Sequence, residues 1–271
     1  MVEDGDITAI ITTHSTAIIS ALSDYPHSTV CFMKKSADQR QELQFVHVTE
    51  SHRAILPIFG AHPLTNVFNQ KPGLIVEGED DERVWQQAVR SANGLLRLHP
   101  VPCSGVSNMH EFEVTVDNII SSVYDTARAF SLRDGDGIAD DMTDSGAITR
   151  LRLSCRAVEN LMLTNEVLQK AGVSEANFRL RVDDWIVANP GHQEQASMLA
   201  FRDSGYNRKD SDLKMIRNVL VGDVLQSPKA WEVIVGQALG AFAAISDTRL
   251  TGPGTLTDFL GPKVIDAIFN H

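Results

Sequence analysis

Four acidic side chains occur in two short groups that have the composition of a divalent-metal site. Glu77 and Asp81 are four residues apart, and Asp134 and Asp136 flank a single glycine. Hard cations such as Mg²⁺ or Mn²⁺ take several oxygen ligands. One or two such ions activate water and neutralise charge on the leaving oxygen in phosphodiester cleavage. These residues therefore predict a metal-dependent reaction at a phosphodiester, with the four carboxylates in catalytic and metal-binding roles.

Each acidic group follows an apolar run that is typical of a buried strand. The run at 73–76 precedes Glu77, and a strand expected at 129–133 precedes Asp134. A helix expected from about residue 81 to 92 places Asp81 in its first turn, and Gly78 would permit a tight turn before it. Open α/β sheets carry their sites at the carboxyl ends of strands, so we expect the four carboxylates to meet there.

The alternation of strand-like and helix-like segments defines the expected fold class. A strand at 97–103 and a helix around 114–124 separate the two acidic groups, and Pro100 and Pro102 favour an edge position for that strand. This alternation predicts an α/β fold with a mostly parallel sheet flanked by helices. Helices are expected at 154–171 and 174–188, the second beginning at Ser174 with Asn177, and the pattern stays helical to the end. Two earlier strands are expected at 29–33 and 44–48.

Composition limits the classes of protein to consider. The 271 residues carry a formal net charge of −11, which argues against coating nucleic acid by bulk attraction. No apolar run approaches the roughly 20 residues of a membrane span, so no membrane partner is expected. Three distant cysteines, Cys31, Cys103 and Cys155, give neither a disulfide framework nor a zinc site and fit a reducing cytosol. Basic residues gather in the second half, where they would suit phosphate contacts or a solvated helical surface.

Two motifs resemble those of a known family. The segment 76–81 (VEGEDD) is similar to the glutamate motif of Toprim domains, and 133–136 (RDGD) to their DxD motif. The acid four residues after Glu77, and the helix containing Arg156-x-x-Glu159-Asn160, resemble the version found in OLD (overcoming lysogenization defect) nucleases. The resemblance covers roughly residues 71 to 168. It implies a Toprim, Rossmann-like core with a C-terminal helical part, Glu159 as a further metal ligand, and cleavage of DNA with Mg²⁺ or Mn²⁺.

The N-terminal segment adds a partner to this interpretation. The run Ile10-Ile11-Thr12-Thr13-His14 resembles the strand and histidine switch of ABC-type ATPases, in which the histidine senses the γ-phosphate of ATP. No GxxxxGK[ST] loop occurs in the chain, so ATP would be bound only through an ATPase portion outside this sequence. We therefore expect residues 1–70 to be the tail of an ATPase domain, 71–150 the Toprim core and 151–271 a helical part. A structural role for His14 at a strand end stays open, as does a homo-oligomer.

One position departs from the family pattern. OLD-type nucleases use a lysine after glycine near a tryptophan-containing helix, and here Gln237 follows Gly236 in the corresponding segment that starts at Trp231. Glutamine offers no ammonium to a scissile phosphate. Another lysine could substitute, and the candidates are Lys229, Lys214 and Lys263.

Alternative interpretations remain for the same residues. The acid-rich segment 134–141 looks like a single calcium loop, but Ile138 stands where an EF-hand needs Asp or Asn. Glu79, Asp80 and Glu82 are explained by the preference for acids at a helix N-terminus. The main functional alternative is a non-catalytic Toprim module that binds nucleic acid or protein. A primase or topoisomerase fragment is disfavoured, because the chain has no zinc motif and no evident active-site tyrosine.

Overall fold

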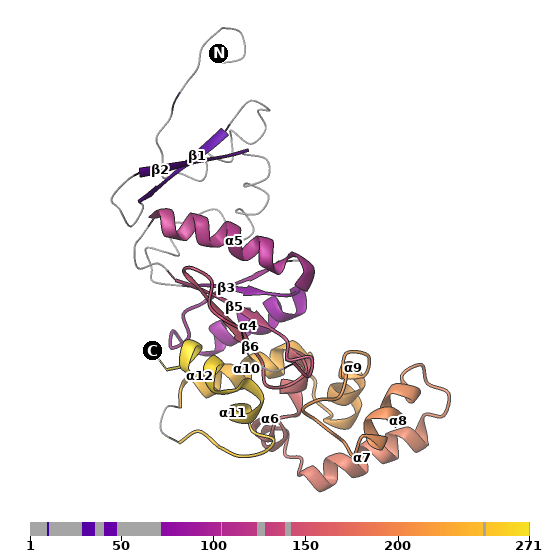
Figure 1. The fold of residues 1–271 in the computed structure, drawn as a ribbon. Helices are drawn as coiled ribbons and strands as arrows, with labels where there is room; N and C mark the ends of the chain where they lie inside the picture. Colours follow the sequence, from indigo (N-terminus) through magenta and orange to yellow (C-terminus); the bar gives the residue numbers. More distant parts are fainter. Residues whose placement is uncertain are drawn as a thin grey trace.

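A four-stranded parallel sheet forms the centre of the computed structural model (Figure 1), which describes residues 10, 29–35, 41–47, 72–103, 105–123, 128–138, 142–245 and 248–270. The strand order is β4-β3-β5-β6, and every neighbouring pair is parallel. The strands are β3 (Gly73–Val76), β4 (His99–Pro102), β5 (Ala129–Arg133) and β6 (Ile148–Arg152). The expected α/β class, with a parallel sheet flanked by helices, is confirmed.

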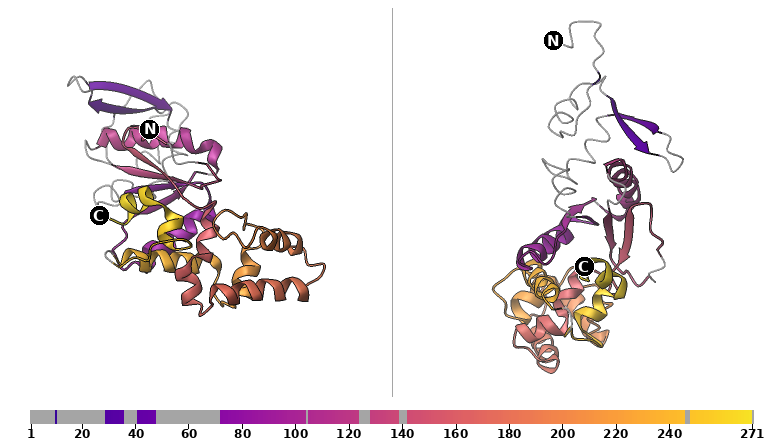
Figure 2. Two further views of the ribbon diagram at one scale, coloured as in Figure 1. Left: turned by 60° about the horizontal axis from the view of Figure 1, so that its bottom comes forward. Right: turned by 90° about the vertical axis from the view of Figure 1, so that its left-hand side faces the viewer.

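Helices cover both faces of the sheet, because successive side chains of a strand point to opposite sides. Ile75 packs with Met109, Val116 and Ile120 of helix α5 (Val106–Val123) on one face. Leu74 and Val76 belong to a larger core on the other face, with helix α4 (Glu79–Ser91) and the C-terminal helices. Figure 2 shows α5 on one side of the sheet and the C-terminal part of the chain on the other.

The C-terminal part consists of short helices that share one hydrophobic core with the sheet. Helices α7 and α8 extend away from the sheet in Figure 1, whereas α10, α11 and α12 lie beneath it. The elements in chain order are η1 (Val158–Leu163, a 3-10 helix), α6 (Asn165–Lys170), α7 (Glu175–Ala188), α8 (Gln195–Asp203), α9 (Arg217–Val219), η2 (Leu220–Val224, a π-helix), α10 (Trp231–Ala243), α11 (Leu256–Leu260) and α12 (Pro262–Ile268).

Two glycines let α10 lie directly against α4. A Cβ atom at Gly236 would stand 2.5 Å from Cβ of Gln87, and one at Gly240 would stand 2.6 Å from Cβ of Ser91. Neither helix could keep this separation with a larger residue at these positions. This close approach holds α10, which begins at Trp231, directly against α4.

Most elements agree with the sequence expectations, with shifted ends. The strand carrying Pro100 and Pro102 is an edge strand, as predicted. The predicted helix start at Ser174 is confirmed, because the Ser174 hydroxyl accepts a hydrogen bond from the main-chain N–H of Asn177. Helix α5 begins eight residues before the expected position, at Val106.

Two differences concern the segment after the DxD motif. The helix expected at 154–171 is wrong in its first half: helical structure begins at Val158 as a 3-10 helix, and α6 follows after Thr164. Strand β6 was not expected, and it spans the domain boundary proposed at residue 150.

The N-terminal expectations are only partly covered by the described residues. Strands β1 (Thr29–Lys35) and β2 (Gln41–His47) form an antiparallel pair close to the two strands predicted there. The assignment of His14 as a nucleotide sensor falls outside the described residues. None of the described helices has the length and apolar character needed to cross a membrane.

Candidate metal centre

The carboxyl ends of β3 and β5 place Glu77 beside Asp134. The two strands are neighbours in parallel register, with Leu74 opposite Phe130. The main-chain N–H of Asp134 donates a hydrogen bond to Oε1 of Glu77 at 3.1 Å. Residues 57 positions apart in the sequence thus meet at one edge of the sheet.

Asp81 and Glu159 complete a cluster of four carboxylates, which we call the acid centre (Glu77, Asp81, Asp134 and Glu159). Burial and the charges of Asp134's three acidic neighbours raise the pKa of Asp134 to about 9. Burial and the charges of Glu159 and Glu77 likewise raise the pKa of Asp81 to about 7. Each shift means that negative charge is crowded here and poorly solvated.

Local hydrogen bonds orient the two aspartates. Oδ1 of Asp134 accepts from the main-chain N–H of Val158 at 3.1 Å, at the first residue of η1. Oδ2 of Asp81 accepts from the main-chain N–H of Gly78 at 3.1 Å and so caps helix α4. The chain turns within the two residues between β3 and α4, as expected, but the turn does not require a glycine, because the φ of −143° at Gly78 is extended backbone that any residue adopts.

The glycine of the DxD motif is required by close backbone packing. A Cβ atom at Gly135 would lie 2.0 Å from the carbonyl oxygen of Cys155. The N–H groups of Gly135 and Asp136 donate to the carbonyl oxygens of Cys155 and Arg156 at 3.1 and 2.9 Å. This pairing ties the DxD segment to the chain that leads to Glu159.

Asp136 lies apart from the other four predicted acids. Its side chain is exposed, and its backbone has a φ of +48° in the left-handed region. Asp136 is also absent from the charges that raise the pKa of Asp134. The structure therefore brings together Glu77, Asp81, Asp134 and Glu159 and leaves Asp136 at the solvent boundary.

Arg217 is the cation that contacts the acid centre. Its Nη1 donates to Oε1 of the buried Glu159 at 2.8 Å, and its Nη2 lies 2.9 Å from Oδ2 of Asp80. The guanidinium group also lies over the ring of Trp231, 5.0 Å from its centroid. The guanidinium group of Arg217 thus pairs with one acid of the centre, Glu159, and with the neighbouring Asp80.

The proposed lysines take other positions. Lys229 donates to Oε1 of Gln237 at 2.9 Å, and Lys263 donates to the carbonyl oxygen of Met142 at 3.1 Å. Lys214 is exposed on the segment before α9. Arg217 belongs to the basic residues of the second half that were expected to suit phosphate contacts, but its pairing with Glu159 was not predicted.

The carboxylates share a neighbourhood without converging on one point. Within the described ranges, no group of three or more His, Cys, Asp or Glu side chains is arranged so that it could hold a metal ion. Charge interactions extend beyond the roughly 2.0–2.6 Å of metal coordination, so this is compatible with the raised pKa values. The donor chemistry, oxygen atoms with excess negative charge, suits a hard divalent cation.

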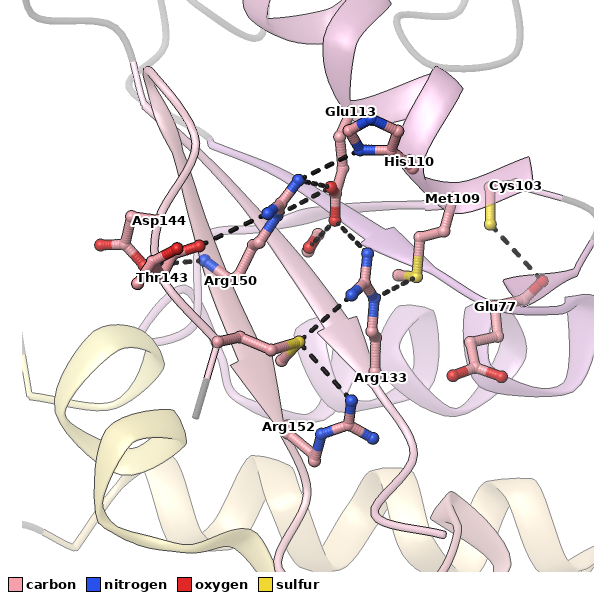
Figure 3. A network of polar contacts seen from close by, with 12 residues as sticks. Glu77, Cys103, Met109, His110, Glu113, Arg133, Thr143, Asp144, Arg150 and Arg152 are labelled. Carbon is pink, nitrogen blue, oxygen red and sulfur yellow. Dashed lines mark hydrogen bonds and ion pairs between the residues drawn. The ribbon is translucent and has the colours of Figure 1, made fainter. Parts of the chain in front are cut away.

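A second polar cluster, on the α5 face of the sheet, was not recognised in the sequence (Figure 3). The Glu113 side chain has no exposed area and lies 2.9 Å from Nη2 of Arg133 and 2.6 Å from Nη2 of Arg150. Ser131 Oγ donates to the same carboxylate. The available signal was the position of Glu113 on the apolar side of α5, between Met109 and Val116.

Arg152 connects this second cluster to the acid centre. Its Nη1 donates to the carbonyl oxygen of Asp134 at 2.8 Å. Since Arg133 directly precedes Asp134, the two clusters lie at the same end of the sheet.

Comparison with known proteins gives two similar solved structures. The C-terminal region of the Xanthomonas campestris pv. campestris OLD protein matches with 10% identity and a TM-score of 0.32, over 74% of this chain and 93% of that one. The C-terminal region of the Burkholderia pseudomallei OLD protein matches with 11% identity and a TM-score of 0.27, over 64% and 87%. The chain is similar in structure to OLD C-terminal regions. No family model and no curated protein matches the sequence.

Proposed function

We propose that this chain carries the nuclease centre of a metal-dependent DNA endonuclease of the OLD type. The observation that carries the proposal is the acid centre itself. Four carboxylates from three separate segments lie together at one sheet edge, where Arg217 pairs with Glu159, and burial together with the three neighbouring acids raises the pKa of Asp134 to about 9. Such an arrangement is costly without a further cation, and perturbed acids of this kind concentrate at functional sites.

The carboxylate donors of these residues suit one or two Mg²⁺ or Mn²⁺ ions, which would have to draw the side chains closer together than they stand. Glu77, Asp81 and Asp134 would hold the first ion, with Glu159 as a further ligand, and the exposed Asp136 would serve an ion at the solvent side. Bound there, the metal would supply an activated water and neutralise charge on the phosphodiester.

The chain's own residues would hold the centre in place. The N–H of Val158 holds one oxygen of Asp134, and Arg217 holds one oxygen of Glu159. These bonds leave the second oxygen of each carboxylate for an ion. Deprotonation of Asp81 and Asp134 accompanies binding, so metal affinity increases as the pH rises.

We also propose that the nuclease centre works with an ATPase domain or subunit in the cytoplasm. The support is the likeness of the segment ending in His14 to an ABC-type switch. ATP would act through that partner.

A second candidate function is a Toprim module that binds nucleic acid or protein without cleaving it. It is favoured by Gln237 in the place of the expected lysine, and by carboxylates that do not converge as they stand. Mn²⁺ titration distinguishes the two functions. Heat released by binding at a site that Asp134→Asn removes supports the nuclease, whereas no such site supports the binding module.

Nicking of supercoiled plasmid DNA in Mg²⁺ or Mn²⁺ tests the proposal directly. Glu77→Gln and Asp134→Asn should each reduce the rate by about 100-fold or more, because each removes a metal ligand. Glu79→Gln is the matched control, since this acid is two residues from Glu77 and exposed. Undiminished nicking by Glu77→Gln would refute the assignment.

A further inference from the structure

Three arginines on the α5 face form what we call the arginine rack (Arg133, Arg150 and Arg152). The first extends from the end of β5 and the other two from alternate positions of β6. Figure 3 shows the three guanidinium groups one after another, from Arg150 through Arg133 to Arg152, and Arg133 and Arg152 both reach the sulfur atom of Met142.

One buried carboxylate fixes two members of the rack. Oε1 of Glu113 accepts from Arg133, and Oε2 accepts from Nε of Arg150 at 2.8 Å. Arg152 is fixed by the carbonyl oxygen of Asp134. The guanidinium groups are therefore oriented before any ligand arrives, which lowers the entropy lost on binding.

Several donors of the rack lack a strong acceptor. Nε and Nη1 of Arg133 point to the sulfur atoms of Met109 and Met142 at 3.3 and 3.2 Å. Nη2 of Arg152 points to the Met142 sulfur at 3.6 Å, and its Nε is buried without a hydrogen-bond partner. Thioether sulfur is only a weak acceptor, so these cationic N–H groups are under-satisfied.

The charges of the rack do not cancel. Among the described residues, Arg133 and Arg150 share the single carboxylate of Glu113, Arg152 has no carboxylate partner, and His110 contacts Arg150. Asp144 accepts from the main-chain N–H of Arg150 and lies 3.4 Å from Lys263, so its charge is matched by that lysine. The surplus is positive, directly beside the negative acid centre.

We propose that the arginine rack binds phosphate groups of a DNA strand and guides that strand past the acid centre. Guanidinium groups bind phosphate oxygens in bidentate geometry, and fixed arginines are well suited to it. A phosphate would take the place of the Met142 thioether, which a flexible methionine side chain can vacate. Arg133 and Arg150 keep 17% of their side-chain surface exposed, which gives access from solvent.

This inference deepens the proposed nuclease function, because the strand held here is the strand to be cut. It nevertheless concerns binding alone. DNA binding measured in EDTA therefore tests the arginine rack apart from catalysis. Absence of metal binding or of nicking in the unaltered chain would refute the nuclease function but would not contradict DNA binding by the rack.

The experiment is fluorescence anisotropy of a labelled DNA oligonucleotide in EDTA, over a series of salt concentrations. Arg133→Gln and Arg152→Gln should each weaken binding about tenfold, since a hydrogen bond to a charged group is lost. Each should also reduce the slope of log affinity against log salt by about 1. Arg133→Gln leaves Glu113 paired with Arg150 and Ser131, so the fold is preserved.

Arg90→Gln is the matched control, because Arg90 is exposed in the last turn of α4 and its substitution removes the same charge. Equal losses in Arg90→Gln and in the rack variants would overturn the proposal, as would unchanged affinity and slope in the rack variants. Failure of the unaltered chain to bind DNA would overturn it too.

Met142→Glu tests the same site without removing an arginine. The new carboxylate would occupy the anion position, so it should raise the melting temperature and abolish DNA binding. Full DNA affinity in Met142→Glu would contradict the proposal. Inorganic phosphate should compete with DNA in the unaltered chain and leave the melting temperature of Met142→Glu unchanged.

Discussion

The acid centre and the arginine rack lie at the same end of one sheet and carry opposite charge surpluses. In the acid centre, four carboxylates lie together and Arg217 pairs with one of them, Glu159. In the rack, Arg133 and Arg150 share Glu113, and Arg152 has no carboxylate partner among the described residues. The buried carboxylate of Glu113 is surrounded by donors, whereas that of Asp134 is surrounded by other acids. The negative charge of Glu113 is therefore neutralised by arginines of the same chain, whereas the acid centre needs a bound cation to neutralise its charge.

The largest expected effect is a loss of stability when Glu113 is removed from its pairing with the arginine rack. Glu113→Ala removes the counter-charge of Arg133 and Arg150, whose side chains are only 17% exposed, and this should cost about 3–5 kcal/mol of unfolding free energy. Urea unfolding followed by circular dichroism measures it. Glu79→Ala, at an exposed acid, should cost less than about 0.5 kcal/mol. Equal losses in the two variants would mean that the Glu113 network contributes no stability.

The junction between the two clusters should be nearly as sensitive. Gly135→Ala places a Cβ atom 2.0 Å from the Cys155 carbonyl oxygen, so the DxD segment must move. We expect a loss of about 1–3 kcal/mol together with weaker Mn²⁺ binding. Gly137→Ala is the control: its φ is +70° with nothing within 4 Å, so it should cost only about 1 kcal/mol and leave the metal affinity intact. Retained Mn²⁺ affinity in Gly135→Ala would contradict the close packing.

Stability should depend on pH because of the acid centre. The pKa values of Asp81 and Asp134 are raised to about 7 and about 9 in the folded chain, so between about pH 4 and pH 9 it binds more protons than the unfolded chain. Without metal, the melting temperature should therefore fall as the pH rises through this window. Asp134→Asn should flatten the fall and raise the melting temperature near pH 8 by a few degrees.

Differential scanning calorimetry in EDTA at several pH values measures this effect. Added Mn²⁺ should flatten the same dependence in the unaltered chain, because the ion competes with protons. A melting temperature that rises steadily from pH 5 to pH 9 in EDTA would be inconsistent with an uncompensated acid centre.

The smallest expected effect is that of replacing the guanidinium group at position 217 with the ammonium group of a lysine. Arg217→Lys keeps the charge but cannot contact Glu159 and Asp80 together as a planar fork. We expect less than about 1 kcal/mol of destabilisation and a several-fold change in Mn²⁺ affinity, measured by calorimetric titration. Unaltered metal affinity in both Arg217→Lys and Arg217→Gln would show that this residue does not orient Glu159.

The sequence predicted those parts of the site that depend on local pattern. Apolar runs located β3 and β5, and the carboxyl ends of parallel strands were expected to bring Glu77 and Asp134 to one sheet edge. The direct pairing of β5 with β3 was not predicted. The position of Asp81 followed from helix geometry. Glu159 was anticipated only through the family resemblance, since its approach depends on the pairing of Gly135 with Cys155.

Pairings between distant residues could not be predicted. The arginines at 150 and 152 hide the strand pattern of β6, because charged residues occupy positions that face α5 in the structure. The partnership of Glu113 with Arg150 joins residues 37 positions apart. Arg217 reaches Glu159 only because the packing of α10 on α4 sets Trp231 beneath its guanidinium group.

The edge strand β4 has a consequence for assembly. The N–H groups of His99 and Cys103 point inward and donate to Pro72 and Val76, so the alternate positions, Pro100 and Pro102, face outward. Proline has no N–H group, and a strand arriving from another molecule would find acceptors there and no donors from these two residues. This border resists growth of the sheet from one molecule into the next.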